Sequence, residues 1–139
     1  MIKRRIILAV IMILAVPAVS LCAELKIAID GVNIPVEWED NESVNALKKL
    51  APLTVEMSAY GGFEQVGSLG SRAKTLPRND TPITTRPGDI VLYSGNQIVI
   101  FHGSNSWSYT RLGKITGKSQ SELSEILDKS GVTLTISAE

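Results

Sequence analysis

The sequence contains one cysteine and one histidine, and each scarcity excludes a class of structure. A single cysteine cannot form an intramolecular disulfide, and a single histidine cannot build a multi-histidine metal site. Lysine plus arginine and aspartate plus glutamate both total 14, and this balance excludes a strongly basic nucleic-acid-binding protein. We therefore expect no metal site and no nucleic-acid partner.

Aromatic residues are also scarce, at 5% of the chain, so their positions carry information. Hydrophobic residues total 44% and charged residues 20%, which is typical of a globular chain and not of a disordered one. The 139 residues suit one domain, and no internal repeat or linker divides them.

The first 23 residues have the pattern of a secretory signal peptide. Basic residues at 3–5 precede an unbroken apolar run at 6–16, and Pro17 and small residues follow. We predict a signal peptide at 1–23 and a domain at 24–139, which is exported to the periplasm or the extracellular space and has no membrane attachment after cleavage. Loss of the three basic residues leaves 11 basic residues against 14 acidic ones, so the exported chain is mildly acidic.

Alternatives to cleavage exist. The stretch from Ile6 to Ala23 has 18 residues and just reaches the length of a retained membrane anchor. Cys22 could carry a lipid, although the bulky Leu21 precedes it where a lipoprotein signal has a small residue. A buried core helix is disfavoured because the run has no polar face.

Beyond the N-terminal segment, short alternations of apolar and polar residues predict β-strands. Gly31 separates two such stretches, 25–30 and 32–38, and this arrangement indicates a hairpin. Segment 94–96 contains glycine and asparagine, which tolerate the positive φ of a tight turn, and it should join a second hairpin. The remaining predicted strands are 53–57, 90–93, 97–102, 107–112 (ending at Gly113) and 132–136.

Two short helices complete the expected elements. One follows the cap residues of segment 40–43 and ends before Pro52, and the other begins at a capping box formed by Ser119 and Glu122. About seven hairpin-connected strands favour a mainly β fold, a closed barrel with helices capping its ends, because closure removes exposed strand edges. Segment 60–87 is predicted as a long loop, where function is expected.

Several catalytic motifs are incomplete. Gly62 and Gly67 have the spacing of a phosphate-binding loop, but the required lysine is missing, and no dinucleotide fingerprint follows a strand. We expect no cofactor. His102, Ser104 and Asp89 would form a hydrolytic triad only if the fold brought them together, and a structural strand histidine is the preferred interpretation.

Two segments, 60–64 and 101–111, hold five of the seven aromatic residues. Glycines beside aromatic rings let the backbone approach a ligand while the rings supply apolar surface. The alternative is that the rings fill the barrel. We predict that these segments meet, that Glu64 and Arg111 pair, and that a ligand contacts Tyr60, Phe63, Glu64, Asn105, Trp107, Tyr109 and Arg111.

These segments also carry a family resemblance. The chain resembles the small bacterial and archaeal cyclophilin-like proteins from residue 25 to residue 136, through MSAYGGFE at 57–64, LP at 76–77, PGDIVLY at 87–93 and NSWSYTRLG at 105–113. The resemblance implies a closed β-barrel with helix-capped ends, in agreement with the strand pattern.

The resemblance implies less about activity. Cyclophilins isomerise X-Pro bonds with an arginine beside a proline pocket, but their Phe-His-Arg and Gln-Gly-Gly-Asp segments are absent here. Arg72 and Arg111 are the only candidate substitutes, so the catalytic residues and the existence of an enzyme activity stay open. We expect an exported domain that binds a peptide or small ligand in an aromatic-lined groove. A peptidyl-prolyl cis-trans isomerase with a non-standard active site is the alternative.

Overall fold

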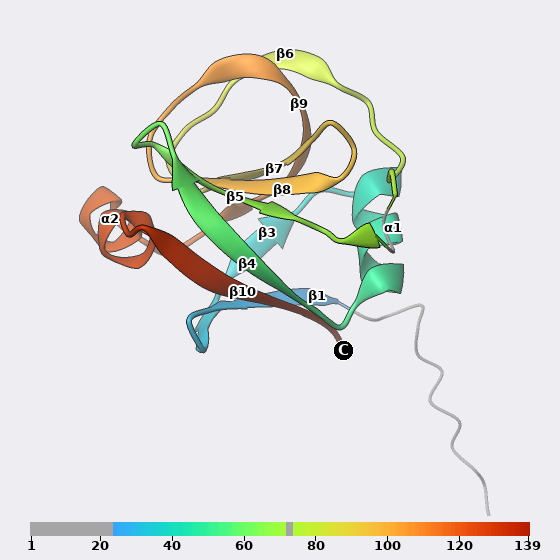
Figure 1. Ribbon diagram of the computed structural model, residues 1–139, viewed down its shortest axis with the longest axis horizontal. Helices are drawn as coiled ribbons and strands as arrows, with labels where there is room; N and C mark the ends of the chain where they lie inside the picture. The colour runs from blue at the N-terminus through green and yellow to red at the C-terminus, as the bar shows by residue number, and fades with distance from the viewer. Residues whose placement is uncertain (1–23, 72–73) are drawn as a thin grey trace, which may run out of the picture.

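The computed structural model describes residues 24–71 and 74–139 (Figure 1). The predicted signal peptide at 1–23 and the candidate Arg72 lie outside the described residues. In the described part of the chain, no helix is both long and apolar enough to cross a membrane.

The described residues form ten strands and two helices. In chain order these are β1 (Leu25–Ile29), β2 (Val32–Ile34), β3 (Val36–Trp38), α1 (Glu42–Leu50), β4 (Leu53–Tyr60), β5 (Glu64–Ser68), β6 (Thr81–Thr84), β7 (Asp89–Tyr93), β8 (Gln97–Phe101), β9 (Ser106–Ile115), α2 (Gln120–Leu127) and β10 (Gly131–Ala138).

The strands form one antiparallel, nearly closed barrel. Nine of them pair in the order β2-β1-β10-β4-β5-β8-β7-β9-β3, and β6 pairs with β9 outside this path. The two ends of the path, β2 and β3, are consecutive in the chain and are separated only by Pro35, so the edges of the sheet meet. Trp38 Nε1 donates a hydrogen bond of 2.8 Å to the Leu25 carbonyl at this seam. The predicted mainly β barrel is confirmed.

The two helices lie on opposite sides of the barrel (Figure 1). Asn41 caps α1 by accepting from the Val44 amide, and Ser119 and Glu122 form the predicted capping box of α2. Both helices bury leucines completely, and these include Leu47 in α1 and Leu127 in α2. The prediction of two capping helices is therefore confirmed.

Strands β7 and β8 are buried on both faces. Ile90, Leu92, Ile98 and Ile100 are fully buried in the main core, as their alternation indicates. The intervening residues Val91, Val99 and Phe101 point the other way and form a second, smaller cluster with Tyr109 of β9. Another part of the chain must therefore pack on the outer face of β7 and β8.

Segment 60–87 is more ordered than the predicted long loop, because it contains β5 and β6. Neither strand has a clear apolar alternation, and each is stabilised by its neighbours, β5 by β4 and β8 and β6 by β9. Strand β9 also continues through Gly113 instead of ending there. A Cβ atom at Gly113 would lie 2.7 Å from the Glu37 carbonyl oxygen, so glycine permits the close approach of β3.

Candidate functional site

Strand β9 belongs to two layers. Its second half pairs with β7 in the barrel, and its first half pairs with β6 from Tyr109 to Ser106. The paired β6 and β9 form an arch over the outer face of β7 and β8, which Figure 1 shows as the ring at the top of the molecule. Ile83 of β6 packs against the second cluster, and the first half of β9 forms one wall of a hollow against the sheet.

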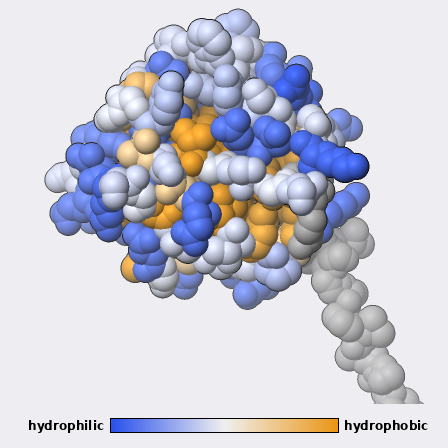
Figure 2. Space-filling model, viewed as in Figure 1, coloured by the Kyte–Doolittle hydropathy of each residue, from blue (hydrophilic) through white to orange (hydrophobic). Residues whose placement is uncertain are grey.

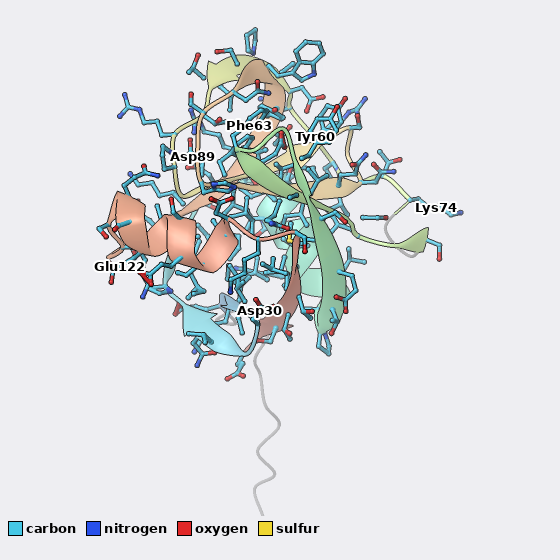
Figure 3. All side chains as sticks on the ribbon, turned by 60° about the vertical axis from the view of Figure 1, so that its left-hand side comes forward. Asp30, Tyr60, Phe63, Lys74, Asp89 and Glu122 are labelled. Atoms are coloured by element: carbon cyan, nitrogen blue, oxygen red, sulfur yellow. The ribbon has the colours of Figure 1, made fainter. Side chains whose placement is uncertain are left out.

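The hollow is a pocket of about 420 Å³. Its lining includes six of the seven predicted site residues, namely Tyr60, Phe63, Glu64, Asn105, Trp107 and Tyr109. Figure 3 shows Tyr60 and Phe63 together at the tip of the hairpin formed by β4 and β5. In Figure 2, hydrophobic residues occupy the middle of this face of the molecule and hydrophilic residues surround them. The structure thus brings together two segments about 40 residues apart in the chain.

Four further lining residues were not predicted, namely Val66, Tyr93, Gln97 and Val99. Tyr93, the last residue of β7, pairs with Gln97, the first residue of β8, beside the turn that joins the two strands. The alternation of β7 and β8 could have indicated two of these residues, because Tyr93 and Val99 occupy strand positions that do not point into the main core.

Arg111 does not line the pocket, and its predicted pairing with Glu64 is wrong. Its Nη1 atom lies 3.3 Å from Asp89 Oδ2, and the Asp89 side chain is only 9% exposed. Arg111 stands opposite Val91, next to a shift of register between β7 and β9, and Asp89 lies two residues along β7 from Val91. The Asp89 carboxylate also accepts the Arg86 amide at 2.9 Å, so it is fixed in place beside the arginine.

Glu64 is a largely buried residue whose carboxyl group has no partner in the described part of the chain. The residue is 6% exposed and lines the pocket, and its side chain makes no hydrogen bond and no ion pair with any described residue. Burial raises the pKa of the Glu64 carboxyl to about 7. The strand pairing of Glu64 with Phe101 holds the backbone here, as do the His102 and Gly103 amides, which both donate to the Phe63 carbonyl.

Tyr109 is held from the loop before β9. Asn105 Nδ2 donates to Tyr109 Oη at 2.7 Å, and the Asn105 backbone is hydrogen-bonded to Thr85. Burial raises the pKa of Tyr109, and the nearby negative charge of Glu64 raises it further. Tyr109 is therefore a protonated hydroxyl near neutral pH, with its hydrogen available to a group in the pocket.

The rings around Tyr109 do not stack on it. The Tyr93 and Tyr109 rings lie 6.0 Å apart with planes 66° from parallel, and the Phe101 ring meets Tyr109 at 5.6 Å and 68°. Edge-to-face packing of this kind is favourable because the positive ring edge meets a negative ring face. The Tyr93 and Phe101 rings therefore meet Tyr109 at steep angles and not face to face.

A family model described as the cyclophilin-like family matches residues 27–137. The chain belongs to the cyclophilin-like family. The match confirms the resemblance found in the sequence. A search of the curated proteins returned no match.

For this cyclophilin-like domain, the isomerase alternative requires an arginine beside the pocket. No arginine is among the described residues that line it, and Arg111 is occupied by Asp89. Arg72 lies outside the described residues, so the isomerase hypothesis stays a prediction without a placed catalytic group.

The hydrolytic triad considered for this cyclophilin-like chain is not assembled. The Asp89 carboxylate accepts from Arg86 and Arg111, and no bond to His102 is formed. In the described ranges, no cluster of three or more histidine, cysteine, aspartate or glutamate residues is placed to hold a metal ion. The pocket's own polar groups are one carboxyl, three phenols and two amides among apolar side chains, and they suit binding.

Proposed function

We propose that this protein is an exported cyclophilin-like domain that binds a peptide or small molecule in the aromatic pocket under the arch of β6 and β9. One observation carries the proposal. Tyr60 and Trp107 line the pocket and yet are 68% and 59% exposed, so these rings do not fill the barrel. Large aromatic side chains left in solvent beside a hollow are typical of binding surfaces.

The dimensions of the pocket support the same function. Its volume of about 420 Å³ lies in the range of small-molecule sites, which are mostly apolar with a few placed polar groups. Here Glu64, Gln97, Asn105 and the tyrosine hydroxyls supply the polar groups among aromatic and valine side chains. A bound ligand would find apolar walls and a small number of directional contacts.

The binding function is tested by titrating the domain with a panel of short peptides and small-molecule fragments, followed by backbone amide NMR. For compounds that bind, we expect shift changes around the pocket and a loss of affinity of about tenfold or more in Trp107→Ala, since exposed aromatic anchors dominate binding. Val32→Ala is the matched control because Val32 is equally exposed, at 59%, but lies on β2. Equal losses in both variants, or shift changes away from the pocket, would contradict the proposal.

Export is the second part of the proposal, and it rests on the basic, apolar and small-residue pattern of residues 1–23. We expect the mature protein to begin between Leu21 and Glu24. N-terminal sequencing of the exported protein checks this expectation. Recovery of a chain with an intact N-terminal Met1 in the membrane fraction would indicate a retained anchor instead.

A further inference from the structure

The pocket has a carboxyl group in its lining and no described basic residue. Glu64 is its only lining residue with a carboxyl group, and of the described residues no lysine, arginine or histidine lines it. The Asp89–Arg111 ion pair on β7 and β9 lies outside the lining. No described residue therefore neutralises the charge of the Glu64 carboxylate, and a cationic ligand would supply the counter-charge.

The aromatic walls have the same electrostatic preference. The face of an aromatic ring is negative and attracts cations placed within about 6 Å of its centre. Tyr60 and Trp107 present exposed rings from β4 and β9, and the half-buried Tyr93 adds a third ring from β7. Tyr109 meets Tyr93 edge to face and is only 4% exposed, so it packs against that ring and offers little surface of its own. Exposed rings beside a carboxylate are complementary to a cation that also has apolar surface.

We propose that the pocket binds the quaternary ammonium group of an organic cation. The inference rests on the proposed function and adds the class of ligand. A primary ammonium or a metal ion is strongly hydrated and needs several hydrogen-bond acceptors in exchange for its water, and Glu64 is the only charged acceptor here. A quaternary ammonium group has no N–H donors, so it is weakly hydrated, keeps its charge and gains apolar contact with the rings.

Binding of such a cation is coupled to the protonation of Glu64. The titratable groups that line the pocket with it are the phenols of Tyr60, Tyr93 and Tyr109, on β4, β7 and β9, and the lining residues of β8 are uncharged. The raised pKa of Glu64, about 7, leaves the carboxyl partly protonated at neutral pH. Because a cation binds to the ionised form, its affinity should increase about tenfold between pH 6 and pH 8.

The test compares choline with 3,3-dimethylbutan-1-ol, in which a carbon atom replaces the charged nitrogen. Binding is followed by the NMR shifts of the pocket amides and of the Trp107 indole, with Trp38 at the barrel seam as an internal reference. We expect choline to bind at least tenfold more tightly than the alcohol and to show the stated dependence on pH. Glu64→Gln should weaken choline binding about tenfold, remove its pH dependence and leave alcohol binding unchanged.

The control variant is Glu125→Gln, which removes the same charge from an exposed position on α2 and should change neither affinity. Thermal unfolding confirms that both variants are folded. A peptide with trimethyllysine forms a separate arm. If this peptide binds more tightly than choline, recognition of a trimethylammonium group is supported and the ligand that carries the group is a peptide.

Equal affinity for choline and its neutral analogue would overturn the inference and leave the proposed binding function intact. Failure of choline and of the trimethyllysine peptide to bind would also overturn it, while the compound panel decides the binding function separately. A pH dependence that survives in Glu64→Gln would show that another group recognises the cation.

Discussion

Truncation of Ile100 to alanine is expected to lower the free energy of unfolding by about 2–5 kcal/mol, the cost of deleting a large buried aliphatic side chain. Ile100 is fully buried in the main core at the centre of the barrel. It pairs with Gln65 on β5 and with Ile90 on β7, so the backbone around it is held on both sides and cannot collapse into the cavity. Urea unfolding followed by circular dichroism measures the loss.

The control is Val32→Ala on the exposed side of β2, for which a change within about 0.5 kcal/mol is expected. A loss of less than about 0.5 kcal/mol in Ile100→Ala would show that Ile100 does not lie on the face of β8 that points into the main core. The two variants together separate the effect of burial from the effect of removing any aliphatic group from a strand.

Much of the barrel was predictable because local signals and tertiary structure agree. Alternation marks β1 and β10, Gly31 marks the first hairpin, and the capping box at Ser119 marks the start of α2. The arch was not predictable in this way. Strand β6 contains Pro82 and one half-buried residue, Ile83, and it exists only because β9 provides a partner. Its stability is a tertiary effect, which a local pattern cannot show.

The sequence predicted which residues line the pocket better than it predicted which charged residues pair. Two segments hold most of the aromatic residues, and six of the seven residues predicted from these segments line the pocket. Arg111 pairs with Asp89 because β9 lies next to β7 in the sheet, whereas Glu64 is on β5, which does not neighbour β9. The isolation of Glu64 likewise depends on the tertiary structure, which buries most of the residue in the pocket without placing a described cation beside it.

That isolation has a measurable effect on stability. The free energy of unfolding is expected to fall by about 1–3 kcal/mol as the pH rises from about 4.5 to above 7. The Glu64 carboxyl has a pKa of about 7 in the folded protein, against the ordinary value of 4.5. Between these values the folded protein binds more protons than the unfolded chain, so raising the pH favours unfolding. Below pH 4.5 both states are protonated and the effect vanishes.

Glu64→Gln isolates this contribution, because glutamine keeps the shape of the side chain and does not ionise. The variant should be more stable than the original protein at pH 8, and the difference should diminish toward pH 5, as measured by urea unfolding at a series of pH values. Glu122 does not interfere. Its hydrogen bonds with Ser119 lower its pKa below 4.5, so its stabilising contribution is complete above that value and is lost only at lower pH. A stability profile that is identical in the two proteins would mean that Glu64 is solvated in the pocket, and the carboxylate would then have no need of a cationic ligand.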